Sequence, residues 1–200
     1  MSSYEVVRDA VKAAPSPTQG RLHFAALLAR EAGLGPDDFI IVGGSAIEFH
    51  TVGEYTSGDI DIVSSRSDAL RGILRGWTFT GGPRVWVVEG LEIVVDLVKY
   101  PYTGDLARTQ VVATPFGAVR IAGIEDLLVK RLASAKHWKI PGNVDHARLL
   151  AVLYRDRIDW DYVRRFAAHN DVEDFLDALL RSIERAYGGR KTGSSTTGRR

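Results

Sequence analysis

Short apolar runs bounded by turn residues alternate with helically spaced stretches over residues 1–122. Apolar runs of about four to eight residues are typical of strands, and apolar residues three and four positions apart are typical of helices. The pattern predicts strands at 39–42, 59–63, 84–88, 91–98, 110–113 and 118–122, and helices at 4–13, 21–32, 45–52 and 67–74. Because only Glu89 and Gly90 separate two of these strands, we also expect a tight hairpin there.

From Gly123 onward the apolar spacing changes to the helical period and keeps it. We expect helices at 124–137, 144–154, 159–168 and 172–187. The last stretch, 188–200, holds only Gly, Ser, Thr and basic residues, so it cannot bury apolar surface and we expect it to be disordered. We therefore predict an α+β fold, in which a mixed β-sheet core with flanking helices (1–122) is followed by a helical half packed on it (123–187).

Composition narrows the possible functions. At 200 residues the chain is long enough for one well-packed core with a helical annex, and we expect no independent second domain. Lys and Arg number 26 against 25 Asp and Glu, so any surface that attracts nucleic acid must be local. The absence of cysteine excludes disulfides, thiolate zinc sites and a thiol nucleophile, and it fits a cytoplasmic protein. We find no apolar run of membrane-spanning length and no signal-peptide core, so we expect an unprocessed protein with no membrane partner.

Two aspartates one residue apart are the first candidates for chemistry. Alternate residues of a strand point to the same face, so Asp59 and Asp61 should project together while Ile60 and Ile62 face a core. Asp96 lies in another predicted strand and can add a third carboxylate if the two strands are neighbours. Hard oxygen ligands of this kind suit Mg²⁺. Solvated acids at strand ends are the alternative, but acids are depleted in strands, and one among valines is costly without a partner.

A glycine turn precedes these acids in the sequence. Gly43 and Gly44 would let the backbone approach a phosphate closely, and the helix that follows would offer its N–H groups to an anion. Ser45 could hydrogen-bond a phosphate, cap the helix, or do both. The glycine patterns of dinucleotide-binding folds and P-loops are both missing from the sequence. A cation site beside an anion site predicts a nucleoside triphosphate (NTP) bound with Mg²⁺.

Taken in chain order, Gly44-Ser45, Asp59-Ile-Asp61 and Asp96 resemble the motif of the DNA polymerase β-like nucleotidyltransferase superfamily. Within it, the stretches 41–50 and 57–63 are similar to the opening of the minimal bacterial AbiEii- and MenT-type toxins. A weaker likeness lies in 124–133, which carries Lys130, and in 144–148, which carries Asp145. The resemblance covers residues 36–168 and implies a nucleotidyltransferase-type sheet.

The resemblance also implies roles for these residues. Asp59 and Asp61 would bind both of two Mg²⁺ ions, and Asp96 would bind the catalytic ion and help to take the acceptor's proton. The nucleotide, such as ATP, would be held by a further set: Gly43, Gly44, Ser45, Lys130 and Asp145. The acceptor would be RNA, a tRNA 3′ end in particular. The protein would then be the toxin of a toxin–antitoxin pair, with a cognate antitoxin protein as partner.

Other interpretations stay open at this point. Lys130 could equally be a surface lysine. Four cationic or imidazole side chains surround Trp138 and could contact a nucleic-acid strand or form a solvated face: Arg131, Lys136, His137 and Lys139. The acceptor could instead be a small cationic molecule such as an aminoglycoside, or a protein side chain. A non-catalytic nucleotide- or partner-binding module is the remaining alternative, and the presence of all three carboxylates argues against it.

Overall fold

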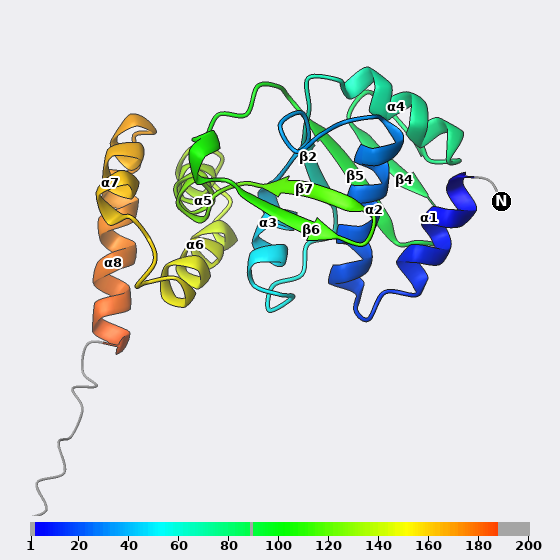
Figure 1. Ribbon diagram of the computed structural model, residues 1–200. Helices are drawn as coiled ribbons and strands as arrows, with labels where there is room; N and C mark the ends of the chain where they lie inside the picture. The colour runs from blue at the N-terminus through cyan, green and yellow to red at the C-terminus, as the bar shows by residue number, and fades with distance from the viewer. Residues whose placement is uncertain (1–2, 89, 188–200) are drawn as a thin grey trace, which may run out of the picture. The chain divides into compact units, whose positions relative to one another are not determined.

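The computed structural model describes residues 3–88 and 90–187 and confirms a mixed fold of helices and one sheet (Figure 1). The chain forms two compact units, and the division falls between Leu127 and Leu128. The predicted hairpin residue Glu89 and the tail at 188–200 lie outside the described residues. Every described helix is too short or too polar to cross a bilayer.

A seven-stranded sheet forms the centre of the first unit, in the order β3-β4-β5-β2-β1-β7-β6. Its strands are β1 (Ile40–Val42), β2 (Ile60–Val63), β3 (Thr80–Gly81), β4 (Val85–Val88), β5 (Ile93–Val98), β6 (Gln110–Thr114) and β7 (Gly117–Ile121). The pairs β2·β5 and β1·β7 are parallel, and the other four pairs are antiparallel. The sheet therefore places β5 directly beside β2, although about thirty residues separate them in sequence.

The two faces of this sheet differ in character. Ile60, Ile62 and Val95 are fully buried on one face, as the alternation in the sequence predicts. Asp61 and Asp96 lie opposite each other in the register and point to the other face. Val85 pairs with Asp96 and continues that face, where it is 46% exposed. One face is thus core, and the other carries the polar side chains.

Helices cover the apolar face. They are α1 (Ser3–Lys12), α2 (Pro17–Glu31), α3 (Gly43–His50) and α4 (Ser67–Gly76), with a short 3₁₀ turn, η1 (Leu106–Arg108), before β6. Figure 1 shows α2 lying across the strands with α1 beside it. Phe24 of α2 meets Trp77 and Phe79 ring to ring, at centroid distances of 5.9 and 5.5 Å. These aromatic contacts join α2 to the segment that follows α4.

The second unit is helical. Helix α5 (Ile124–His137) starts in the first unit and continues into the second, where α6 (Gly142–Leu153), α7 (Trp160–His169) and α8 (Glu173–Tyr187) follow. Helices α7 and α8 lie side by side (Figure 1). Val163, Ala167, Leu176 and Leu179 are buried on these two helices, so their apolar stripes form a core.

Some predicted boundaries are wrong. Helix α3 begins at Gly43 rather than at residue 45, and its N-cap is Val42, so Ser45 does not cap it. Val88 pairs with Ile93, so the connection between β4 and β5 is longer than the expected two-residue hairpin. The sequence pattern also missed β3, which has only two residues, and the 3₁₀ turn η1.

Candidate metal and nucleotide site

Three carboxylates meet on the polar face of the sheet. Asp61 and Asp96 are direct neighbours across β2 and β5, and Asp59 immediately precedes β2. One oxygen from each of the three lies within 4.8 Å of the others. Asp96 is buried, and Asp59 and Asp61 are half-buried. The sequence-predicted set of metal ligands is therefore brought together in one place.

The glycine turn hydrogen-bonds both the carboxylate and the backbone N–H of Asp61. The backbone N–H of Gly44 donates to Asp61 Oδ2 at 2.9 Å, and the N–H of Asp61 donates to the hydroxyl of Ser45 at 3.0 Å. That hydroxyl in turn donates to the carbonyl of Val42 at 3.0 Å. Ser45 is fully buried, so in this structure its hydroxyl joins β1 to β2.

Gly43 packs against the same carboxylate. Its φ is +59°, a conformation that side chains with a Cβ rarely adopt. A Cβ added there would lie 2.1 Å from Asp61 Oδ2. The position needs glycine for two reasons, its backbone conformation and its closeness to a candidate metal ligand.

Asp59 is placed by a buried acid on α3. The hydroxyl of Ser57 donates to Asp59 Oδ1 at 2.9 Å, and the N–H of Ser57 donates to Glu48 Oε2 at 2.8 Å. Glu48 is fully buried and also accepts from the hydroxyl of Thr18 at 2.7 Å and from the guanidinium of Arg21 at 2.5 Å. A buried charge needs such partners to be tolerated. Glu48 thus ties α2, α3 and the loop before β2 to one another.

Arg84 binds the third carboxylate. Its Nε and Nη2 donate to the two oxygens of Asp96 at 2.5 and 2.6 Å, which is a bidentate pair. The pKa of Arg84 is raised, first by these hydrogen bonds and by the charge of Asp96, and also by the charges of Asp61 and Asp59. The three acids therefore act together on one cation.

These features fit a hard divalent cation. All the donors are carboxylate oxygens, they converge from two adjacent strands and the residue before one of them, and the cluster already attracts a guanidinium. Mg²⁺ is usually bound through one or two carboxylates together with substrate phosphates, which is what an open cluster on a sheet face can provide.

The two remaining predicted site residues belong to the second unit. Lys130 of α5 donates to Asn170 Oδ1 at 2.9 Å, and its ammonium lies 5.0 Å from the ring centroid of Phe166. Asp145 is in the first turn of α6, where its carboxylate lies 3.9 Å from Arg148 Nε. Both side chains contact groups within their own unit.

The basic stretch around Trp138 is partly used in packing. Lys136 forms ion pairs with Asp171 and Asp174 at 3.5 and 3.0 Å, and Arg131 donates to Asn143 at 3.2 Å. Trp138 itself is 69% exposed. Lys136 and Arg131 thus contribute to the packing of the second unit.

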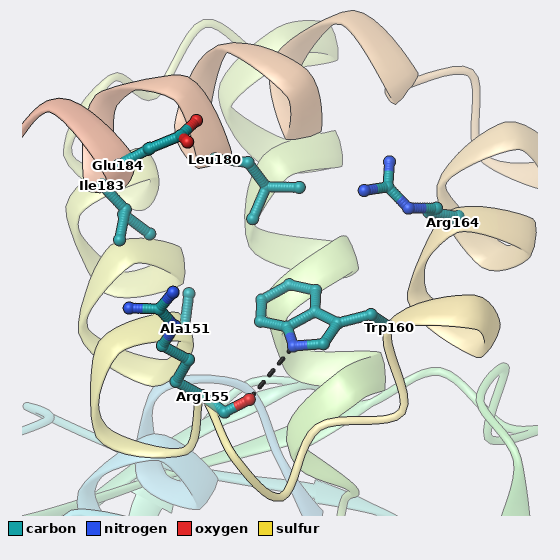
Figure 2. Close-up of a pocket in the computed structure, with 7 residues that line it drawn as sticks. All are labelled: Ala151, Arg155, Trp160, Arg164, Leu180, Ile183 and Glu184. Carbon is teal, nitrogen blue, oxygen red and sulfur yellow. Dashed lines mark hydrogen bonds between the residues drawn. The ribbon is translucent and has the colours of Figure 1, made fainter. Parts of the chain in front are cut away.

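A cavity of about 270 Å³ opens between α6, α7 and α8 (Figure 2). Its walls are Ala151, Arg155, Trp160, Arg164, Leu180, Ile183 and Glu184. The indole N–H of Trp160 donates to the backbone carbonyl of Arg155 at 3.1 Å, which fixes the orientation of the ring. An indole between two guanidinium groups can hold a flat ring next to an anion.

Sequence reasoning missed Arg84, Glu48 and Ser57. Arg84 follows Pro83 immediately before β4, and Glu48 lies on α3 between the apolar residues Ile47 and Phe49. An acid inside the apolar pattern of 45–52 is the one signal that could have identified Glu48, since such an acid must find a buried partner. Comparisons with protein-family models, curated proteins and solved structures gave no match.

Proposed function

We propose that the protein is a Mg²⁺-dependent nucleotidyltransferase that transfers a nucleotide from an NTP to RNA, as the toxin of a toxin–antitoxin pair. The observation that carries the proposal is the convergence of Asp59, Asp61 and Asp96 within 4.8 Å, beside the glycine turn at the start of α3. A carboxylate cluster provides a place for a cation, and the start of α3, where the N–H of Gly44 donates to Asp61 in this structure, would provide the adjoining place for a phosphate.

In the proposed reaction a hydroxyl oxygen of the acceptor attacks the α-phosphorus of the NTP. A new P–O bond forms, the bond between the α-phosphorus and the bridging oxygen breaks, and pyrophosphate leaves. Asp96, the buried carboxylate, is our candidate to receive the hydroxyl proton. Asp59 and Asp61 would hold Mg²⁺, which when bound neutralises the charge of the phosphates. Gly43 and Gly44 would let the phosphates approach the backbone at the start of α3.

The test is transfer of labelled phosphate. Purified protein is incubated with each of the four NTPs, labelled in the α-phosphate, with Mg²⁺ and total RNA. We expect label in an RNA band, lost by more than about a hundredfold in Asp59→Ala and Asp61→Ala, because the metal ligands act as a unit. Asp38→Asn is the matched control, since this exposed aspartate lies in the turn before β1. Labelling that survives both alanine variants would contradict the site assignment.

The choice of RNA as acceptor has its own support in the second unit. The cavity beside Trp160 has the size and composition to receive one unstacked base, with Arg155 and Arg164 at its rim to contact phosphates. We expect Arg155→Gln combined with Arg164→Gln to weaken RNA labelling while leaving Mn²⁺ binding unchanged. If label appeared on the protein itself or on an added aminoglycoside instead, that molecule and not RNA would be the acceptor.

The toxin role is tested in cells. Induced expression should stop growth, and Asp59→Ala should abolish that effect at the same protein level. A protein encoded by a neighbouring gene should restore growth by binding the toxin. Growth arrest that persists in Asp59→Ala would separate toxicity from nucleotidyl transfer.

A further inference from the structure

The bidentate pair between Arg84 and Asp96 uses both oxygens of a candidate metal ligand. Each oxygen accepts a short hydrogen bond from the same guanidinium, at 2.5 and 2.6 Å. A metal ion that bound Asp96 would compete with this cation for the same lone pairs. In the structure, the Arg84 guanidinium therefore supplies the positive charge beside Asp96 that a metal ion would otherwise supply.

The backbone of Arg84 is paired with β5, whereas its side chain is largely exposed apart from the contact with Asp96. Its carbonyl accepts from the N–H of Leu97 at 3.0 Å, which extends the pairing of β4 with β5 by one residue. The side chain is 63% exposed, whereas that of Asp96 is 10% exposed. Within the part of the chain that the structure describes, Asp96 is the hydrogen-bond partner of this guanidinium. Breaking that one contact would free the side chain to turn through solvent.

A guanidinium suits phosphate as well as carboxylate. Its planar fork matches both groups with two parallel hydrogen bonds. Arg84 lies beside a cluster of three acids, and its charge is attracted by all three. A divalent ion in the cluster would remove much of that attraction, and the triphosphate of an NTP would bring a new anion to the same face.

We propose that Arg84 is an exchangeable counter-ion, which neutralises Asp96 in the metal-free protein and transfers to the triphosphate when a divalent ion binds the three carboxylates. Arg84 thereby weakens the binding of metal when no nucleotide is present and strengthens the binding of metal together with nucleotide. This inference rests on the proposed function for its ligands. It adds a residue and an order of events that the three acids alone do not specify.

The first experiment measures binding without catalysis. Free Mn²⁺ is titrated by electron paramagnetic resonance, and tripolyphosphate with Mn²⁺ is titrated by calorimetry at constant ionic strength. We expect Arg84→Gln to bind Mn²⁺ alone about three- to tenfold more tightly than wild type, and to bind tripolyphosphate about tenfold more weakly. Arg66→Gln removes an exposed arginine before α4 and should change neither affinity.

Arg84→Lys separates charge from geometry. It keeps the positive charge but loses the fork, so both affinities should lie between those of wild type and Arg84→Gln. Thermal unfolding and circular dichroism check that each variant is folded, and Arg84→Lys takes the place of Arg84→Gln if the latter is not. Unchanged or weaker Mn²⁺ binding in the variant, or unchanged tripolyphosphate binding, would overturn the proposal.

A spectroscopic readout follows Arg84 directly. In ¹⁵N-labelled protein, the Nε–H resonance that disappears in Arg84→Gln reports the bond to Asp96. We expect it to shift when Mg²⁺ is added and to shift again with tripolyphosphate. A resonance that does not move while metal binds would show a permanent clamp and overturn the exchange. If wild type transferred label normally but behaved in this way, only this inference would fail, whereas wild type that bound neither probe would overturn the proposed function as well.

Discussion

At the scale of single residues, the site depends on contacts that leave no room for substitution. Gly43 combines a φ of +59° with a backbone that packs on the carboxylate of Asp61. Its neighbour Gly44 donates to the same carboxylate. Two glycines therefore set the position of one candidate metal ligand, Gly43 by its closeness and Gly44 by its hydrogen bond.

We expect Gly43→Ala to destabilise the protein by about 1–3 kcal/mol, because alanine would be strained at this φ, and to abolish Mn²⁺ binding by displacing Asp61. Gly72→Ala is the control, since no atom lies within 4 Å of a Cβ added there and the residue is inside α4. It should stabilise the protein by about 0.5–1 kcal/mol. Chemical denaturation measures both changes, and normal Mn²⁺ binding by Gly43→Ala would contradict the steric role.

His50 predicts a pH dependence of stability. Its Nε2 lies 2.8 Å from the carbonyl of Ala122, and burial lowers the pKa of His50 below its ordinary value of 6.5, although the hydrogen bond and the charge of Glu125 act the other way. The unfolded chain therefore binds a proton more readily than the folded one. The contribution of neutral His50 is fully present above about pH 6.5 and is lost as the pH falls through the lowered pKa.

We expect His50→Gln, which cannot titrate, to reduce the loss of unfolding free energy between pH 7.5 and pH 5.5. The measurement is denaturant unfolding at several pH values, with His169→Gln as a control at an exposed position. An identical pH slope in His50→Gln and wild type would show that His50 does not titrate with folding.

At the scale of elements, α3 links the helical layer to the site. Glu48 lies near the end of this helix and joins Thr18 and Arg21 of α2 to Ser57. Since the hydroxyl of Ser57 donates to Asp59, the buried contacts of Glu48 help to position a candidate metal ligand in the loop before β2. The site is thus supported by a network of hydrogen bonds that begins in α2.

We expect Glu48→Gln to lower the free energy of unfolding by about 1.5–3 kcal/mol, because the amide keeps the shape but loses the charge that Arg21 needs. Mn²⁺ affinity should fall as well, since Ser57 and Asp59 lose their support. Glu54→Gln changes an exposed residue in the loop between α3 and β2, and its free energy of unfolding should stay within about 0.5 kcal/mol of wild type. Unaltered stability in Glu48→Gln would mean that solvent reaches this network.

Local rules explain what the sequence could predict. Asp59 and Asp61 on one side and buried Ile60 and Ile62 on the other follow from the two-residue period of a strand. The placement of Asp96 beside Asp61 depends on the pairing of β2 with β5. That pairing is decided by the tertiary fold and not by the local sequence pattern.

The main partner of Glu48 lies far along the chain. Glu48 bonds Arg21, which is 27 positions away, and nothing near Glu48 in the sequence indicates that pair. The two-residue strand β3 is too short for any period to be visible, and its pairing with β4 forms it. The polar network around the acids thus required the folded chain, whereas the acids themselves were visible in the pattern.

At the scale of the whole molecule, the candidate metal ligands and the predicted nucleotide residue Lys130 belong to different units. Asp59, Asp61 and Asp96 lie in the unit that ends at Leu127, and Lys130 lies in the next one, bonded to Asn170. A ligand that binds only the native state stabilises it by RT ln(1 + [L]/Kd), or about 2.7 kcal/mol at one hundred times Kd. If metal binds the three carboxylates and nucleotide also binds Lys130, metal alone and metal with nucleotide should stabilise different parts of the chain.

Hydrogen exchange measured by mass spectrometry separates the two effects. With Mg²⁺ alone, we expect slower exchange in peptides from β1, β2 and β5, because in the proposed site the ion would bind the three carboxylates of that sheet. If Lys130 binds the triphosphate as the resemblance implies, peptides from α5 should be protected only when an NTP is added as well. Asp61→Asn should remove both effects, and Lys130→Gln only the second. Protection of the sheet by NTP that leaves α5 unchanged would exclude Lys130 from the nucleotide site and leave the three carboxylates, the glycine turn and Arg84 as the groups that bind it.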